Sequence, residues 1–145
     1  MREVVLSPRM VEHAKRRYPL QRFDVAIATD LDLTPGSLGN VLAWWSLFNL
    51  PLDVLPEVVA DFSGLLSSGG QVPIRTHVGE RIIPRRHAYG GVPVTWTPHR
   101  WLPEQLVDVL AAGLERVAEL RFPASGDQPP QVVLAARRLH QIPVT

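Results

Sequence analysis

The sequence predicts one domain of the α+β class over residues 1–145, with a small, largely antiparallel sheet packed with three to four helices. Its 145 residues are 46% apolar and 20% charged, which is typical of a single globular domain with its own core. Apolar residues recur at helical spacing in several segments. Between these segments, short runs alternate apolar and polar residues, as strands with one buried face do.

A short helix followed by a strand is expected at the N-terminal end. Ser7 suits the N-cap and Pro8 the first turn, so a helix is predicted over 7–17. Pro19 ends it, because the residue before a proline avoids helical dihedral angles. A strand is expected over 22–29, since its continuously apolar part is typical of a strand buried on both faces.

The next stretch is unusual because no charged residue occurs between Leu33 and Leu52. Its apolar residues keep helical spacing, which predicts a helix over 36–50 that is apolar on nearly every side. Proline, glycine and asparagine interrupt the run, and its apolar density is too low for a membrane span. A second helix is expected over 53–66, ended by the serines and glycines of 67–70.

The second half of the chain reads as a meander, a helix and a final strand. Alternation over 72–78, with glycine turns after it, predicts a three-stranded meander whose middle strand contains Ile82 and Ile83. The clearest helix is predicted from Pro103 to Leu120, with one apolar face. The run 131–136 is expected to be a strand because it begins with β-branched residues.

Composition excludes several classes of function. The net charge is +1, which argues against a dedicated nucleic-acid binder, since phosphate contacts require a basic excess. Cysteine is absent, so thiolate chemistry and cysteine-bound zinc are excluded. The first residues lack a secretory signal, and a cytoplasmic protein that does not enter a membrane is expected. Preference for arginine over lysine suggests a bacterial or phage source.

Two carboxylates follow the predicted strand over 22–29. Asp30 and Asp32 stand two residues apart and could share one Mg²⁺, the only cofactor that the sequence suggests. The pattern Asp30-Leu31-Asp32-Leu33-Thr34 resembles the first motif of haloacid-dehalogenase-like phosphatases. That resemblance covers about ten residues and implies a nucleophile at Asp30 and an acid or base at Asp32. The family's downstream lysine has no counterpart, and capping of the next helix is the alternative role.

A second candidate site is the Arg/His face, the set of basic residues on and after the meander. Arg75 and His77 are expected on one polar strand face, where His77 is a candidate catalytic residue. Loops could bring further candidates for binding an anionic ligand near them, namely Arg85, His87 and His99. Their spacing fits no standard metal signature. A solvated strand face is the alternative interpretation.

The adjacent Trp44 and Trp45 cannot both pack against one surface of a helix. Together with Leu47 and Phe48, they predict an interface with another chain, although a helix enclosed in the core is the alternative. The sequence therefore favours a non-enzymatic interaction or assembly subunit that contacts copies of itself or a larger protein partner. The second hypothesis is a small metal-dependent phosphatase-like hydrolase or an anionic-ligand-binding protein. Whether the chain is an enzyme stays open.

Overall fold

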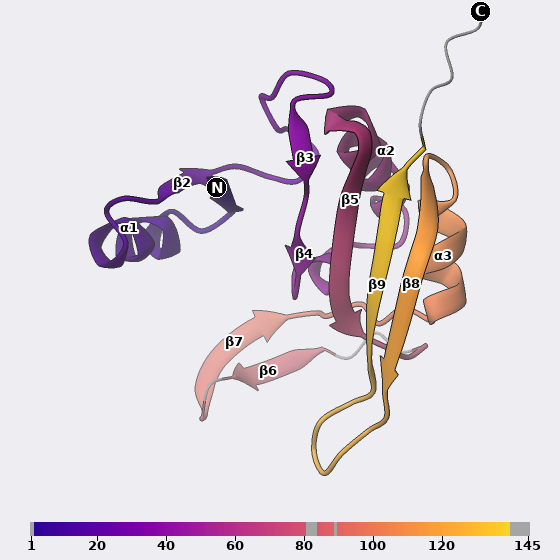
Figure 1. Ribbon diagram of the computed structural model, residues 1–145. Helices are drawn as coiled ribbons and strands as arrows, with labels where there is room; N and C mark the ends of the chain where they lie inside the picture. The colour runs from indigo at the N-terminus through magenta and orange to yellow at the C-terminus, as the bar shows by residue number, and fades with distance from the viewer. Residues whose placement is uncertain (1, 81–83, 89, 140–145) are drawn as a thin grey trace, which may run out of the picture. The chain divides into compact units, whose positions relative to one another are not determined.

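The computed structural model describes residues 2–80, 84–88 and 90–139, in two compact units that are considered separately (Figure 1). Unit 1 is Met1–Leu33 and unit 2 is Thr34–Thr145. In the described ranges, no helix is long and apolar enough to cross a membrane. The expectation of one domain over 1–145 stays a prediction.

Unit 1 is a β-α-β unit. Strands β1 (Arg2–Val5) and β2 (Arg22–Val25) are parallel, and α1 (Pro8–Arg17) connects them. The predicted helix is confirmed: Oγ of Ser7 accepts a hydrogen bond from the Met10 N–H at 3.4 Å. The strand is shorter than predicted and is not buried on both faces, because Val25 and Ile27 are exposed.

Unit 2 contains a mixed sheet of five strands (Figure 1). They are β3 (Leu38–Asn40), β4 (Ala43–Trp44), β5 (Leu66–His77), β8 (Leu114–Phe122) and β9 (Gln131–Arg138). Strands β3 and β4 run parallel to β5, whereas β9 lies antiparallel between β5 and β8. The sheet is therefore not largely antiparallel, as the sequence predicted. Only its C-terminal part pairs in that way.

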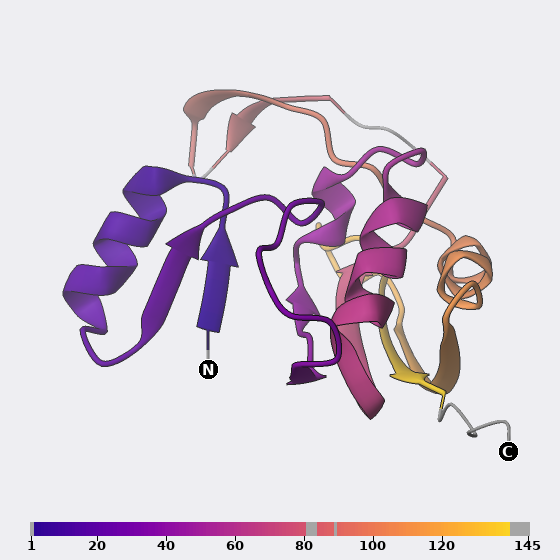
Figure 2. The same ribbon diagram turned by 90° about the horizontal axis from the view of Figure 1, so that it is seen from above.

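Two helices, α2 (Leu55–Leu65) and α3 (Pro103–Leu110), pack beside each other against the sheet (Figures 1 and 2). The Oγ of Ser63 in α2 donates a 3.1 Å hydrogen bond to the carbonyl of Gly113 after α3. The core contains the apolar side chains of both helices and of the strands: Leu55, Val58, Val59, Phe62, Val72, Ile74, Leu106, Leu110, Val132 and Leu134. The apolar residues that follow helical spacing and those that alternate along the strands pack together in this core.

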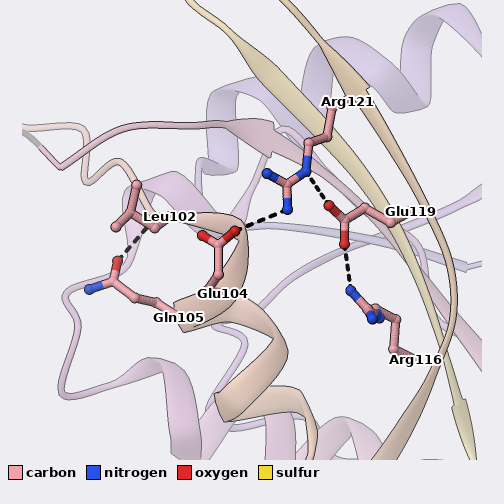
Figure 3. A network of polar contacts seen from close by, with 6 residues as sticks. All are labelled: Leu102, Glu104, Gln105, Arg116, Glu119 and Arg121. Carbon is pink, nitrogen blue, oxygen red and sulfur yellow. Dashed lines mark hydrogen bonds and ion pairs between the residues drawn. The ribbon is translucent and has the colours of Figure 1, made fainter.

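Polar contacts join the start of α3 to β8 on the same side of the sheet (Figure 3). Arg121 donates to Glu104 at 3.0 Å and also pairs with Glu119, which accepts from Arg116 at 2.7 Å. Hydrogen bonding from Arg121 lowers the pKa of Glu119. The side chain of Gln105 accepts a hydrogen bond from the Leu102 N–H at 3.0 Å and so caps the helix.

The predicted helix over 36–50 is wrong. This stretch forms β3, β4 and the 3₁₀ helix η1 (Leu47–Asn49). Gly36 has a φ of 70°, and the backbone of β3 and β4 pairs with β5 instead of with itself. A run of uncharged residues fits buried strands as well as a buried helix, and pairing with β5 decides between them.

The predicted helix from Pro103 to Leu120 is half right. Helix α3 ends at Leu110, and β8 begins at Leu114. Backbone pairing with β9 over the whole of β8 overrides the helical spacing of this segment. The final strand is confirmed as β9.

The predicted three-stranded meander is not seen among the described residues of this segment. Strand β5 pairs with β9, and β6 (Arg85–Ala88) pairs with β7 (Val92–Trp96) in a separate antiparallel hairpin. Ile82 and Ile83, which were expected in the middle strand, lie outside the described residues.

Candidate functional site

The carboxyl ends of β4 and β5 meet at one edge of the unit 2 sheet, because these strands are parallel. Trp44 pairs with Arg75 in register, and His77 ends β5. Arg75 and His77 are two residues apart, so their side chains leave the same face of the strand. Ligands of open α/β sheets bind outside the carboxyl ends of the strands, so this edge is the candidate binding site.

Three aromatic rings surround the guanidinium of Arg75. Its Cζ lies 4.8 Å from the ring centroid of Trp45, 5.1 Å from that of Trp44 and 5.6 Å from that of Phe122. Its Nη2 donates a 2.8 Å hydrogen bond to Gln131, while its Nε is buried without a partner. Among the residues of known position, no carboxylate forms an ion pair with Arg75. The positive charge of Arg75 is therefore stabilised by cation–π contacts with these rings, and no carboxylate among the described residues neutralises it.

The His77 imidazole packs between two rings at the same edge. Its centroid lies 4.7 Å from that of Trp45 and 5.5 Å from that of Phe48, and its Nδ1 is buried without a hydrogen-bond partner. Burial lowers the pKa of His77 below its ordinary value of 6.5, and the charges of Arg100, Arg85 and Arg75 lower it further. The imidazole is therefore neutral at neutral pH and able to accept a proton.

Trp45 reaches both of these side chains through a strained backbone. Its φ is 55°, in the left-handed region that a bulky residue rarely adopts. Its N–H donates a 3.0 Å hydrogen bond to the carbonyl of Arg75, which holds the turn between β4 and η1. Such a conformation costs about 1–3 kcal/mol and is found most often at functional sites.

The β6–β7 hairpin is connected to this edge through Trp96. Its Nε1 donates a 2.8 Å hydrogen bond to Asn49, and its ring centroid lies 5.7 Å from that of Phe48. Trp96 also lines an open groove of about 540 Å³ on the hairpin, with Pro84, Arg85, Arg86, His87, Val94, Thr95 and Thr97. Trp96 therefore contacts both the groove and the rings at the edge.

The predicted ligand-binding residues are only partly brought together. Arg75 and His77 share the edge, and the charge of Arg85 acts on His77. His87 lies on the hairpin groove. His99 lies before α3, where its backbone N–H donates a 2.7 Å hydrogen bond to the carbonyl of Phe48.

The binding of a metal by Asp30 and Asp32 stays a prediction. Asp30 and Asp32 lie exposed in the loop that follows β2, and no helix begins directly after them for the carboxylates to cap. Over the described part of the chain, no group of three or more His, Cys, Asp or Glu side chains could hold a metal ion.

The predicted interface residues divide between core and surface. Leu47 and Phe48 are buried inside unit 2 and Trp45 is half-buried, whereas Trp44 is 43% exposed. Phe122, Gln131 and Trp96 were not predicted as site residues. Phe122 and Gln131 meet only through the register of β8 and β9, which no spacing in the sequence reveals.

Comparison with solved structures identifies the fold. An S-adenosylmethionine-dependent methyltransferase from Methanosarcina mazei is 14% identical, with a TM-score of 0.80 over 95% of this chain and 81% of that chain. The 1,6-didemethyltoxoflavin-N1-methyltransferase of Burkholderia thailandensis is 21% identical, with a TM-score of 0.70 over 94% and 60%. This is the Rossmann-like α/β fold of methyltransferases.

The same fold also carries other chemistry. The [4+2]-cyclase SpnF is 16% identical to this chain, with a TM-score of 0.70 over 95% of this chain and 66% of that one. This chain therefore spans less than two thirds of the Burkholderia enzyme and of the cyclase. No protein-family model and no curated protein matches the sequence.

These likenesses correct three expectations. The α+β class is wrong, because the methyltransferase fold is α/β with a mixed, largely parallel sheet. The interpretation as a non-enzymatic assembly subunit is wrong, and so is the phosphatase-like alternative, because many of the structural neighbours are methyltransferases. The uncharged run that suggested an interface forms two short strands and a 3₁₀ helix, and its contact with another chain stays a prediction.

The residues of unit 1 fit S-adenosylmethionine only in part. Asp30 and Asp32 are exposed after a parallel strand, as suits a carboxylate that binds ribose hydroxyls. The β1–α1 connection lacks the glycines that let a backbone approach such a ligand, and Gly-x-Gly occurs nowhere in the sequence. Ser7 already caps α1 and Pro8 has no N–H to donate. The cofactor site is incomplete in these residues.

Proposed function

We propose that this chain acts in methyl transfer from S-adenosylmethionine to a small acceptor molecule, with His77 as the base that receives the acceptor's proton. The fold likeness to methyltransferases supports the reaction class. The observation that carries the proposal is the imidazole of His77, packed between Trp45 and Phe48 at the carboxyl edge of the sheet.

The chemistry of methyl transfer calls for such a group. Transfer to an oxygen or nitrogen leaves the acceptor with a proton to lose, and a base can take up that proton only when the base is itself unprotonated at the working pH. Burial and three neighbouring arginines lower the pKa of His77, so its free base is the main form at neutral pH. Because unit 1 offers an incomplete cofactor site, the role proposed for His77 concerns only the methyl acceptor and not the binding of the methyl donor.

The surroundings of His77 also suit an acceptor. Trp45, Phe48 and Trp96 form a chain of ring contacts at this edge, which would exclude water from a planar substrate. A groove adjoins the edge at Trp96. The acceptor class favoured by these contacts is a small aromatic molecule with an O–H or N–H group.

Transfer of a tritiated methyl group tests this proposal. The protein would be incubated with labelled S-adenosylmethionine and, separately, with 2-naphthol, 2-naphthylamine and 3-hydroxy-2-naphthoate. We expect label on at least one acceptor, and a loss of about 100-fold or more in kcat for His77→Gln, the usual contribution of a general base.

His13→Gln is the matched control, because His13 is exposed on α1 in unit 1. It should transfer at the rate of the unchanged protein. Absence of transfer by folded protein would overturn the proposed function, while equal rates for His77→Gln and His13→Gln would overturn the role of His77. A cytoplasmic location and association with copies of itself or a larger protein partner stay predictions.

A further inference from the structure

The charged side chains that act on His77 at the carboxyl edge are all positive. In the described ranges, no carboxylate forms an ion pair with Arg75, Arg85 or Arg100, although all three act on His77. Other arginines of the chain do have such partners, as Arg121 and Arg137 show. A positive field without counter-charge attracts anions.

Arg75 has hydrogen-bonding capacity that the chain leaves unused. A guanidinium has five N–H donors in a planar fork, and the only side-chain acceptor it contacts among the described residues is Gln131. Its buried Nε–H has no partner, which is costly inside a protein. A carboxylate matches the geometry of this fork and can accept two parallel hydrogen bonds from it.

The rings beside Arg75 indicate which chemical group the ligand carries next to its anionic group. Trp44 is 43% exposed and Phe122 is 37% exposed, and both contact the guanidinium. Across the same face of the sheet, Arg75 is in register with Val133, which is in register with Leu120. The group that reaches Arg75 is therefore bordered by aromatic and aliphatic surface.

We propose that Arg75 binds the carboxylate of a planar aromatic acid, with the ring of the acid against Trp44 and Phe122. This inference rests on the proposed function, because it names the class of methyl acceptor. Arg75 holds the carboxylate, while His77, two residues further along the same strand face, receives a proton from a neighbouring hydroxyl or amine. The Nε–H of Arg75 is buried in the free protein, so side chains near the guanidinium must move for the acid to reach it.

Binding is measured without any methyl donor, so that the outcome is independent of methyl transfer. Three probes would be titrated by calorimetry and tryptophan fluorescence: 2-naphthoate, its neutral analogue 2-naphthamide, and acetate, which has the charge but no ring. We expect 2-naphthoate to bind with a Kd below about 1 mM. Binding should alter tryptophan emission, and each of the other two probes should bind at least about tenfold more weakly.

Arg75→Gln should weaken 2-naphthoate binding by about tenfold or more, because a charge-assisted hydrogen bond is lost. Arg75→Lys keeps the charge without the planar fork and should retain part of the affinity. Arg137→Gln is the matched control, since Arg137 lies on β9 in the same sheet but is paired with Glu115. It should bind as the unchanged protein does, and thermal melts would establish that each variant is folded.

Equal binding of 2-naphthoate and 2-naphthamide would overturn the inference, as would an equal loss in the two glutamine variants. Tighter binding of 2-naphthyl phosphate than of 2-naphthoate would overturn the choice of carboxylate. Labelled methyl transfer to 2-naphthol without binding of 2-naphthoate would leave the proposed function standing and remove this inference. Binding of 2-naphthoate without any methyl transfer would overturn the proposed function and leave the binding of a carboxylate by Arg75 standing.

Discussion

His77 links the stability of the protein to pH. Its pKa is lowered in the folded state by burial and by Arg100, Arg85 and Arg75, while the unfolded chain keeps a value of about 6.5. Between these two values the unfolded state binds more protons, so the free energy of unfolding rises with pH. Its contribution is complete above pH 6.5 and is lost as the pH falls through the folded-state pKa.

We therefore expect the denaturant midpoint of the unchanged protein to fall between pH 7 and pH 5, and His77→Gln to flatten that dependence. The measurement is a series of urea melts at fixed ionic strength. The aromatic rings of Trp45 and Phe48 contribute no charge, so the arginines are the charged groups that act on His77. An identical pH dependence in the variant would contradict this account of the His77 environment.

Some of this site could be predicted from residues alone. Alternation along 72–77 places Arg75 and His77 on one face, because successive strand residues point to opposite sides. The position of Trp45 could not be predicted. Its left-handed φ depends on a hydrogen bond to the carbonyl of Arg75, 30 positions away in sequence number, and on ring contacts that form only after β4 pairs with β5.

At the scale of elements, α3 and β8 allow a direct comparison of helix and strand. Leu110 is the last residue of α3 and is 2% exposed, whereas Val117 is 51% exposed on β8. Leu110→Ala should lower the free energy of unfolding by about 2–5 kcal/mol, as truncation of buried leucines does. Val117→Ala should cost less than about 1 kcal/mol in the same urea melts. Equal losses would favour the continuous helix that the sequence predicted.

The close approach of β3 and β5 makes a second test. A Cβ on Gly70 would lie 2.8 Å from the carbonyl oxygen of Gly39, which is backbone and cannot move aside easily. Gly70→Ala should therefore destabilise the protein by about 1–3 kcal/mol.

Gly64 provides the control for that change, because nothing lies within 4 Å of a Cβ built on it and it sits within α2. Gly64→Ala should be neutral or stabilise the protein by up to about 1 kcal/mol. Chemical denaturation of both variants checks the pair. A Gly70→Ala protein as stable as Gly64→Ala would show that β3 does not pass so close to β5.

Elements with local signals were predictable, and elements defined by pairing were not. Capping by Ser7 marks α1, and apolar spacing marks α2, because both signals act within a few residues. The stretch 36–50 and the segment 114–122 carry helical spacing, yet strands in the first pair with β5 and the second pairs with β9. Hydrogen bonds to β5 and β9 outweigh the small differences in intrinsic propensity.

At the scale of the whole molecule, the mixed sheet is what separates the observed fold from the predicted one. The antiparallel trio β5, β9 and β8 contains two strands that were at least partly recognised in the sequence. The parallel pairs could not be recognised, since parallel strands are joined by long connections and leave no hairpin signal. The α/β class thus depends on the pairings that sequence patterns report least well.

The fold alone does not determine the reaction, because one fold hosts several chemistries. The carboxyl edge of the unit 2 sheet carries His77, Arg75 and five aromatic rings, whereas the β1–α1 connection of unit 1 contains no glycine. The central claim is that this chain takes part in methyl transfer from S-adenosylmethionine.

Calorimetric titration of S-adenosylhomocysteine into the folded protein tests this claim most directly. The account predicts saturable binding with a Kd below about 1 mM, a free energy of about −4 kcal/mol or stronger. Asp30→Asn combined with Asp32→Asn should weaken it, and Asp127→Asn, on an exposed loop of unit 2, should not. No binding heat up to that concentration, with the protein shown to be folded, would contradict the account.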